Sequence, residues 1–334
     1  MTALLDVQDL TIGFPNATPV RNLSFSVAPA ETLAVVGESG SGKSLTALAL
    51  MRLLPKAARV TSGRIRLGGE ELLALSEIEM RRRRGRDIAM IFQEPMTSLN
   101  PVLTIGRQIT EVLYLHRGLS KAQAHREAAA LLDLVRIPNP EACLEDYPHR
   151  LSGGMRQRVM IAIAVACRPR ILIADEPTTA LDVTIQAQVL ELLDRLRREL
   201  SLSLLLITHD LGLVGQWADR VVVMYAGRKV EEAAPAALFD RPLHPYTRGL
   251  LAASPRLHDR LHYRNARLSE IPGSITSAAT QTGCPFAPRC PERFAPCRTE
   301  FPPERETQSE RRVACHAEPA HSSHGTIHDT AIGL

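Results

Sequence analysis

Three short motifs, spaced along the chain in a fixed order, constrain this sequence more than its composition does. The glycine-rich segment GESGSGKS occupies residues 37–44 and directly follows the apolar run TLAVVG. The segment LSGGMRQR follows at 151–158, and ILIADEP at 171–177 ends an apolar run in two carboxylates. The first motif indicates a phosphate-binding loop, the second a glycine-rich helix start and the third an acidic strand end. Together they predict two nucleotide-contacting faces that close on each other.

The segment 37–44 fits the pattern G-x-x-x-x-G-K-[ST] of a phosphate-binding loop. Its glycines let successive backbone N–H groups face an anion, and a helix that begins near Lys43 directs its positive end to the same place. We expect Lys43 to reach the β- and γ-phosphates of a nucleotide and Ser44 to bind Mg²⁺. The predicted ATP contacts in this loop are Gly37, Glu38, Ser39, Gly40, Ser41, Gly42, Lys43 and Ser44.

The carboxylates that end the apolar run at 171–174 suit the chemistry of phosphate transfer. Asp175, at the expected strand terminus, is placed to hold Mg²⁺ through its water shell. Glu176 is then free to polarise the attacking water as a general base. Two solvated acids after a strand are common, so the phosphate loop earlier in the chain is what favours the catalytic interpretation.

The composition sets broad limits on the partners of the chain. With 40 Lys and Arg against 36 Asp and Glu, the formal charge is +4, too small an excess to argue for nucleic acid. No apolar run approaches the length that spans a bilayer, and the first residues lack the basic start and apolar core of a signal peptide. These features predict a cytoplasmic protein whose six cysteines are reduced unless they hold a metal.

Strand-like and helix-like segments alternate in a way that predicts the α/β class with a parallel sheet. Strand patterns at 4–14, 32–37, 171–174 and 203–208 are separated by helical ones, among them 183–200. A polar, glycine-rich stretch up to Gly69 indicates a small β region, and the chain is mostly helical from about 95 to 166. The residues after 316 are expected to be disordered.

Together these motifs resemble the ATPase subunits of ABC transporters across residues 4–250. The matching segments occur in the family's order and are 31–44, Gln93, 151–157, 171–176, 180–182 and His209. The resemblance implies a P-loop ATPase core with a parallel sheet, a small antiparallel β subdomain, and a helical signature subdomain at about 95–166. It assigns residues 1–250 to the ATPase domain, 251–316 to a C-terminal extension with a four-cysteine site, and 317–334 to a tail.

The same resemblance implies a head-to-tail dimer and further site residues. Ser152, Gly153 and Gly154 of one subunit are expected to close on the ATP of the other, since a hydroxyl and bare N–H groups at a helix start bind anions. The fifth signature residue is most often Gln in the family and is Met155 here. Every catalytic position of the family is filled in this sequence. We therefore expect each chain to supply one working phosphate-loop face and one working signature face.

Four more residues receive roles from the family. His209 resembles the switch histidine that contacts the γ-phosphate. Gln93 resembles the loop glutamine that senses Mg²⁺ and the attacking water. Asp182 resembles the loop that joins two subunits, and Phe14 lies where an aromatic ring could stack on adenine or equally belong to the core.

Several segments are similar to the oligopeptide/dipeptide importer branch, which also covers nickel and opine systems. They are FQEPMTSLNP at 92–101, PLHPYTRGLL at 242–251 and CPFAPRCPERFAPC at 284–297. The branch implies a second homologous ATPase (or a homodimer), two membrane permeases, an extracellular or periplasmic binding protein, and a place at the cytoplasmic face of the inner membrane. A soluble ABC ATPase that acts on ribosomes or DNA, and a nickel or opine substrate, remain as alternatives.

Cysteines 284, 290, 297 and 315 cluster in a proline-rich segment that offers little hydrophobic core. Their spacing is not that of a CxxC zinc ribbon. Four thiolates from one cytosolic segment could hold a [4Fe–4S] cluster or Zn²⁺, which would supply folding energy, or could be free thiols. The branch favours iron–sulfur, with His316 as a substitute ligand, whereas Cys143 and Cys167 are expected to be packing residues.

Overall fold

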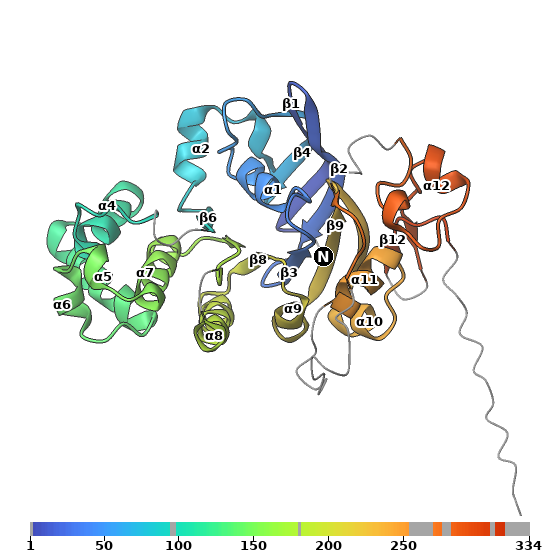
Figure 1. The fold of residues 1–334 in the computed structure, drawn as a ribbon. Helices are drawn as coiled ribbons and strands as arrows, with labels where there is room; N and C mark the ends of the chain where they lie inside the picture. The colour runs from blue at the N-terminus through green and yellow to red at the C-terminus, as the bar shows by residue number, and fades with distance from the viewer. Residues whose placement is uncertain are drawn as a thin grey trace, which may run out of the picture.

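A computed structural model describes residues 3–93, 98–179, 182–253, 270–275, 282–307 and 311–317. The expected disordered tail therefore lies almost entirely outside the described residues. Within those ranges, the elements form two sheets with helices around them (Figure 1). None of the described helices combines the length and the apolar character needed to cross a bilayer.

The smaller sheet is antiparallel, as the resemblance to the ABC family implied. Its four strands have the order β2-β1-β4-β5. Their bounds are β1 Leu5–Phe14, β2 Ala17–Val27, β4 Arg59–Leu67 and β5 Glu70–Glu71. The short helices η1 (Leu72–Ala74) and α2 (Glu77–Arg83) follow, and Ser76 begins α2 with a capping box to Glu79.

The larger sheet has the order β11-β12-β10-β9-β3-β8-β7-β6. The neighbours from β9 to β6 pair in parallel, and the pairs from β9 to β11 are antiparallel. The bounds are β3 Thr32–Val36, β6 Ile88–Ile91, β7 Ile171–Asp175, β8 Ser203–Thr208, β9 Arg220–Tyr225, β10 Arg228–Ala233, β11 Arg305–Glu306 and β12 Arg312–Val313. Because β3, β7 and β8 are parallel neighbours, their carboxyl ends meet at one edge, where α/β proteins bind ligands.

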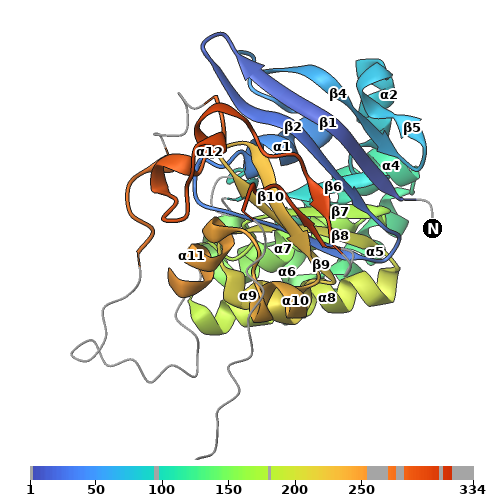
Figure 2. The same ribbon diagram turned by 90° about the vertical axis from the view of Figure 1, so that its right-hand side faces the viewer.

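Of the three hydrophobic cores among the described residues, two cover opposite faces of the parallel strands. On one face, Leu33, Val35 and Ile173 pack with the antiparallel sheet and with α1 (Lys43–Leu50). On the other, Leu172 and Leu204 pack with α8 (Val183–Leu200) and the helical region. Figure 2 shows the antiparallel strands above the main sheet, with α8, α9 (Leu211–Trp217) and α10 (Pro235–Asp240) below it. Alternating strand side chains thus serve both cores.

The helical subdomain predicted at about 95–166 forms one end of the molecule (Figure 1, left). Thr104 caps the start of α4 through its hydroxyl, and Gly118 ends that helix in a left-handed conformation with φ 60°. The helical elements are α4 Ile105–Arg117, α5 Lys121–Leu134, α6 Pro140–Leu144, η2 Pro148–Arg150 and α7 Gly153–Val165.

The C-terminal extension lies at the opposite end (Figure 1, right) and joins the main sheet. It follows α11 (Pro245–Ala253) and contains η4 (Ala287–Arg289) and α12 (Pro296–Thr299). Strand β12 pairs with β10, so the extension supplies the last two strands of the sheet. The sequence did not predict these strands, because each is only two residues long.

A buried ion pair accompanies this strand pairing. The side chain of Glu231 on β10 has an exposed fraction of 0%, and one of its oxygens lies 3.0 Å from Nη2 of Arg311. The backbone N–H groups of Leu243 and His244 donate to the same carboxylate, each at 2.9 Å. Arg311 of the extension therefore neutralises the negative charge of Glu231, which is buried on the main sheet.

Candidate active site

The phosphate-loop segment connects β3 to α1 at the carboxyl edge of the sheet. Two of its glycines are required by close contacts. A Cβ on Gly37 would lie 2.2 Å from the backbone oxygen of Met224 on β9, and one on Gly42 (φ 96°) would lie 2.8 Å from that of Pro19 on β2. The loop is therefore held between the two sheets, and only glycine fits at these points.

Lys43 is buried at the first position of α1, with an exposed fraction of 4%. Its ammonium donates to the carbonyl oxygens of Gly37 and Glu38 at 2.7 and 3.0 Å. Burial lowers the pKa of this amine, and the nearby carboxylates of Glu176, Asp175 and Glu38 oppose that shift. A desolvated cation inside an N–H-lined loop is suited to binding a polyanion.

Asp175 ends β7 beside the phosphate loop, and Ser44 donates its hydroxyl to Oδ1 at 3.1 Å. Burial raises the pKa of Asp175 from 3.8 to about 6; the hydrogen bond from Ser44 and the charge of Lys43 oppose the rise, while Glu176 adds to it. A hydroxyl and a carboxylate at this distance are oxygen ligands of the kind that Mg²⁺ prefers.

The raised pKa of Asp175 predicts that this carboxylate destabilises the metal-free protein at neutral pH. Between pH 3.8 and about 6 the folded chain binds more protons than the unfolded chain, so the free energy of unfolding falls as the pH rises. Metal-free Asp175→Asn should therefore be more stable than the wild type at pH 7.5, by about 3 kcal/mol, and the gain should shrink toward pH 4. Thermal unfolding in EDTA at both pH values measures this. A variant less stable than the wild type at pH 7.5 would contradict it.

Glu176 is the point at which three predicted site residues meet. Gln93 donates Nε2 to its Oε2 at 2.8 Å, and Nδ1 of His209 lies 3.4 Å from its Oε1. Thr179 also donates its hydroxyl to this carboxylate, at 2.9 Å. The backbone of Glu176 is left-handed, with φ 47°, and is held by a hydrogen bond from its N–H to the oxygen of Ile207 on β8. Such strain commonly marks functional sites.

The signature residues form the exposed start of α7. Ser152 is the N-cap, and its hydroxyl accepts from the N–H of Met155 at 3.3 Å. Asp182 caps α8 in the same way, accepting from Ile185 at 3.0 Å. Among the described residues, Ser152, Gly153 and Gly154 make no hydrogen bond or ion pair to the phosphate loop of the same chain. Residues 94–97 and 180–181, which flank Gln93 and Asp182, lie outside the described ranges.

Phe14 is the last residue of β1, and the next strand, β2, contains Pro19, which lies against Gly42 of the phosphate loop. Phe14 is half-buried against the core beneath the antiparallel sheet. It also lines an open cavity of about 490 Å³ together with Thr18 and Lys56. Both alternatives for this residue, packing in the core and stacking on a base, are compatible with this position.

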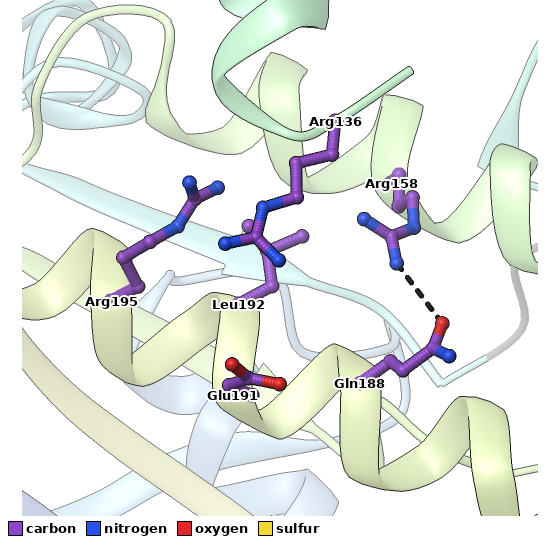
Figure 3. A pocket seen from close by; sticks show the side chains of 6 residues that line it. All are labelled: Arg136, Arg158, Gln188, Glu191, Leu192 and Arg195. Atoms are coloured by element: carbon purple, nitrogen blue, oxygen red, sulfur yellow. Dashed lines mark hydrogen bonds between the residues drawn. The ribbon is translucent and has the colours of Figure 1, made fainter. Parts of the chain in front are cut away.

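A cavity of about 290 Å³ separates α8 from the helical subdomain, and Figure 3 shows the three arginine side chains that line it. Arg158 on α7 donates to the oxygen of Val135 at 2.8 Å and to Gln188 on α8 at 3.2 Å. Arg195 on α8 donates to the oxygen of Leu134. These carbonyls end α5 and lack partners within the helix, so the arginines connect α5, the signature helix and α8.

Cysteines 284, 290, 297 and 315 line one small cavity of about 10 Å³, together with His316. Burial, with a smaller contribution from the three other cysteines, raises the pKa of Cys284 to about 11. His244, also in this lining, accepts from the N–H of Tyr246 through Nδ1 at 3.0 Å, and its buried Nε2 has no hydrogen-bond partner among the described residues. In the described parts of the chain, however, no three His, Cys, Asp or Glu side chains are arranged to hold a metal ion.

Sequence reasoning missed three residues that contact the site. Thr179 binds Glu176, the hydroxyl of Tyr246 accepts from the N–H of Glu38 at 2.9 Å, and Arg289 forms an ion pair with the Glu38 carboxylate at 2.9 Å. Thr179 lies three residues after Glu176, so its position carried a signal. Tyr246 and Arg289 are more than 200 residues from the loop in sequence, and nothing local indicates their contacts.

Two protein families match this sequence. Residues 20–179 match the family described as ABC transporter, and residues 230–297 match the one described as oligopeptide/dipeptide transporter, C-terminal region. The dipeptide transport ATP-binding protein of Bacillus subtilis is 47% identical over 333 residues, 98% of each chain. The oligopeptide transport ATP-binding protein of Salmonella typhimurium is 49% identical over 306 residues, 90% of each chain.

Solved structures share the fold. A dimeric ATP-binding cassette in a post-hydrolysis state with ADP and phosphate is 25% identical, with a TM-score of 0.62 over 69% of this chain and 98% of that one. A component of an ABC transporter complex from Clostridium perfringens is 24% identical, with a TM-score of 0.63 over 72% of this chain and 92% of that one.

Proposed function

The chain belongs to the family of ABC transporter ATP-binding subunits, in its oligopeptide/dipeptide branch, and from that premise we propose that its ATPase activity drives the import of di- and oligopeptides. The observation that carries the proposal is the contact of Glu176 with both Gln93 and His209, beside the phosphate loop. The match of residues 230–297 to the branch's C-terminal region supports a peptide substrate. Action on ribosomes or DNA is not favoured, because the relatives are transport subunits.

In the proposed mechanism, the loop N–H groups and Lys43 bind the β- and γ-phosphates. Ser44, Asp175 and Gln93 would hold Mg²⁺, which when bound neutralises phosphate charge. Glu176 takes a proton from a water whose oxygen attacks the γ-phosphorus, and the bond to the bridging oxygen of ADP breaks. His209 donates to the γ-phosphate oxygens, whose charge the reaction redistributes.

We further propose that two subunits work head to tail. The exposed helix start at Ser152, Gly153 and Gly154 would bind the ATP held by the phosphate loop of the partner, and Asp182 would lie at the junction. Phe14 would stack on the adenine. The dimeric state of the structurally similar cassette supports this arrangement.

The remaining proposals concern partners and boundaries. The partner ATPase is a second homologous subunit or another copy of this chain, and both associate with two permeases and a substrate-binding protein. This places the chain at the cytoplasmic face of the inner membrane, bound through the permeases. Residues 1–250 would form the ATPase domain and 251–316 the extension.

We also propose that the four cysteines of the extension hold a [4Fe–4S] cluster. The proposal is supported by the four cysteines lining one cavity and by the buried Nε2 of His244 in the same lining, a group that could donate to cluster sulfur. The described side chains would have to move to bind the cluster, since no three of them are arranged around a metal ion. When bound, the cluster would supply a covalent crosslink and a redox centre. Zn²⁺ is the alternative that the same thiolates would accept.

Protein purified without oxygen should contain about four iron and four sulfide per chain. Cys297→Ser should lose most of both, whereas the matched control Cys143→Ser, at a buried cysteine of the helical subdomain, should retain them. Iron and sulfide analysis with absorption spectroscopy measures this. Zinc at one per chain, or no metal at all, would overturn the iron–sulfur proposal.

Growth on peptides tests the transport function. A strain that lacks this gene should fail to use di- and tripeptides as its source of a required amino acid, and the wild-type gene should restore growth. Lys43→Ala should not restore it, although Lys121→Ala, at an exposed lysine that begins α5 in the helical subdomain, should. Normal peptide use in the deletion strain, with loss of nickel or opine uptake instead, would reject the peptide assignment.

A further inference from the structure

The phosphate loop is bound directly by the C-terminal extension. Nη1 of Arg289 lies 3.1 and 2.9 Å from the two carboxylate oxygens of Glu38, the second residue of the loop. The two residues are 251 positions apart in sequence. No other ion pair between the described residues joins the loop segment 37–42 to the extension.

Arg289 is held in place by groups other than Glu38. It ends η4 with an exposed fraction of 7%. Its Nε donates to the oxygen of Pro272 at 2.8 Å, its Nη2 to that of Ile271 at 3.0 Å, and its Nη1 also to the hydroxyl of Tyr225 at 3.3 Å. Because these bonds fix the guanidinium, it presents a positive charge to Glu38 with little entropy to lose.

Glu38 places a negative charge in a loop whose other features favour anions. Its carbonyl oxygen accepts from Lys43 at 3.0 Å, and its N–H donates to Tyr246 at 2.9 Å. Its own backbone thus lines the segment that faces the phosphates, and its side chain has an exposed fraction of 27%. Without a counter-ion this carboxylate would repel a bound triphosphate, because like charges at short range inside a protein interact strongly.

We propose that Arg289 is a positioning residue of the nucleotide site: it neutralises Glu38, holds that carboxylate away from the phosphates, and so sets the affinity for ATP. The proposal rests on the function proposed for the phosphate loop and adds to it that the extension completes this loop. Arg289 is followed directly by Cys290, which lines the cysteine cavity.

The proposal is tested by measuring the equilibrium binding of Mg-ATP to full-length variants, in which a second substitution should restore the affinity that the first one lowers. Arg289→Gln should weaken ATP binding about tenfold, because it leaves Glu38 uncompensated. Glu38→Gln in that background should restore the affinity to within about threefold of the wild type, because the repelling charge is then gone. Arg293→Gln is the matched control, since this exposed arginine of the same segment donates to Pro288 and not to the loop.

Two further readouts separate charge from structural support. The loss caused by Arg289→Gln should shrink as salt is raised. The loss of ATP affinity in Arg289→Gln should exceed any loss of its turnover number at saturating ATP, because the groups around Glu176 are unchanged, and Arg293→Gln should keep both values near those of the wild type.

A double variant that binds ATP no better than Arg289→Gln alone would overturn the proposal, as would unchanged affinity in Arg289→Gln. If Arg289→Gln does not fold, Glu38→Gln alone decides: it should bind ATP at least as tightly as the wild type, and weaker binding contradicts the proposal. Failure of the wild type to bind Mg-ATP would instead reject the proposed function of the loop.

Discussion

Replacing Glu176 with glutamine should lower the turnover number for ATP about 1000-fold while leaving the affinity for ATP within about threefold. Glutamine keeps the shape of the side chain, and its amide oxygen can still accept from Gln93 and Thr179. It cannot take a proton from water at neutral pH, so the step that the carboxylate is proposed to assist is lost. Steady-state phosphate release and equilibrium binding of Mg-ATP measure the two effects separately.

Glu145→Gln is the control for this variant, because that carboxylate lies in the helical subdomain with 79% of its side chain exposed. It should keep wild-type turnover. Blocked hydrolysis should also trap the closed dimer, so Glu176→Gln, alone or mixed with its partner ATPase, should elute as a dimer when ATP is present. Adding Gly153→Asp should abolish that dimer, since an acid at this helix start repels phosphate. Turnover of Glu176→Gln near the wild-type value would remove the assignment of the general base.

Replacing Arg311 with methionine should lower the free energy of unfolding by about 3 kcal/mol. Its guanidinium lies 3.0 Å from the fully buried carboxylate of Glu231, and methionine of similar length leaves that charge without its cation. Two backbone N–H groups still donate to Glu231, so the loss should fall at the lower end of the range for broken buried pairs. Urea unfolding at constant protein concentration measures the change.

The neighbouring Arg312→Met provides the comparison. Its side chain is 44% exposed, and its carboxylate partners Glu232 and Glu304 lie at 4.0 and 3.9 Å. Arg312 is partly exposed, both distances are long, and the buried carboxylate of Glu232 keeps Lys229 at 2.6 Å, so this variant should lose less than about 1 kcal/mol. Equal losses in the two variants would mean that strand β12, and not the buried charge, determines the effect.

The strands around the site could be predicted because each is a short, buried apolar run that ends in a motif. The expected strands at 32–37, 171–174 and 203–208 correspond to Thr32–Val36, Ile171–Asp175 and Ser203–Thr208. The helix expected to begin near Lys43 spans Lys43–Leu50, and Arg52 then adopts a left-handed conformation with φ 51°. Pro55 follows, and a proline disfavours helical conformations just before it.

The rest of the site depends on contacts that no local pattern encodes. The spacing of cysteines drew attention to 284–297, yet the residue of that segment that contacts the phosphate loop is an arginine. Strands β11 and β12 are too short for any alternation of polar and apolar residues to be recognised. Their position follows from pairing with β10, which is a property of the folded chain.

The shared sheet has a practical consequence for shortening this protein. A chain that ended at α11 would keep every motif of the ATPase, but the N–H and C=O groups of β10 that now pair with β12 would face water. An open strand edge next to a buried, unneutralised glutamate is a template for pairing between copies. We therefore expect such a fragment to aggregate, and the catalytic core to be obtainable in monodisperse form only with its C-terminal residues attached.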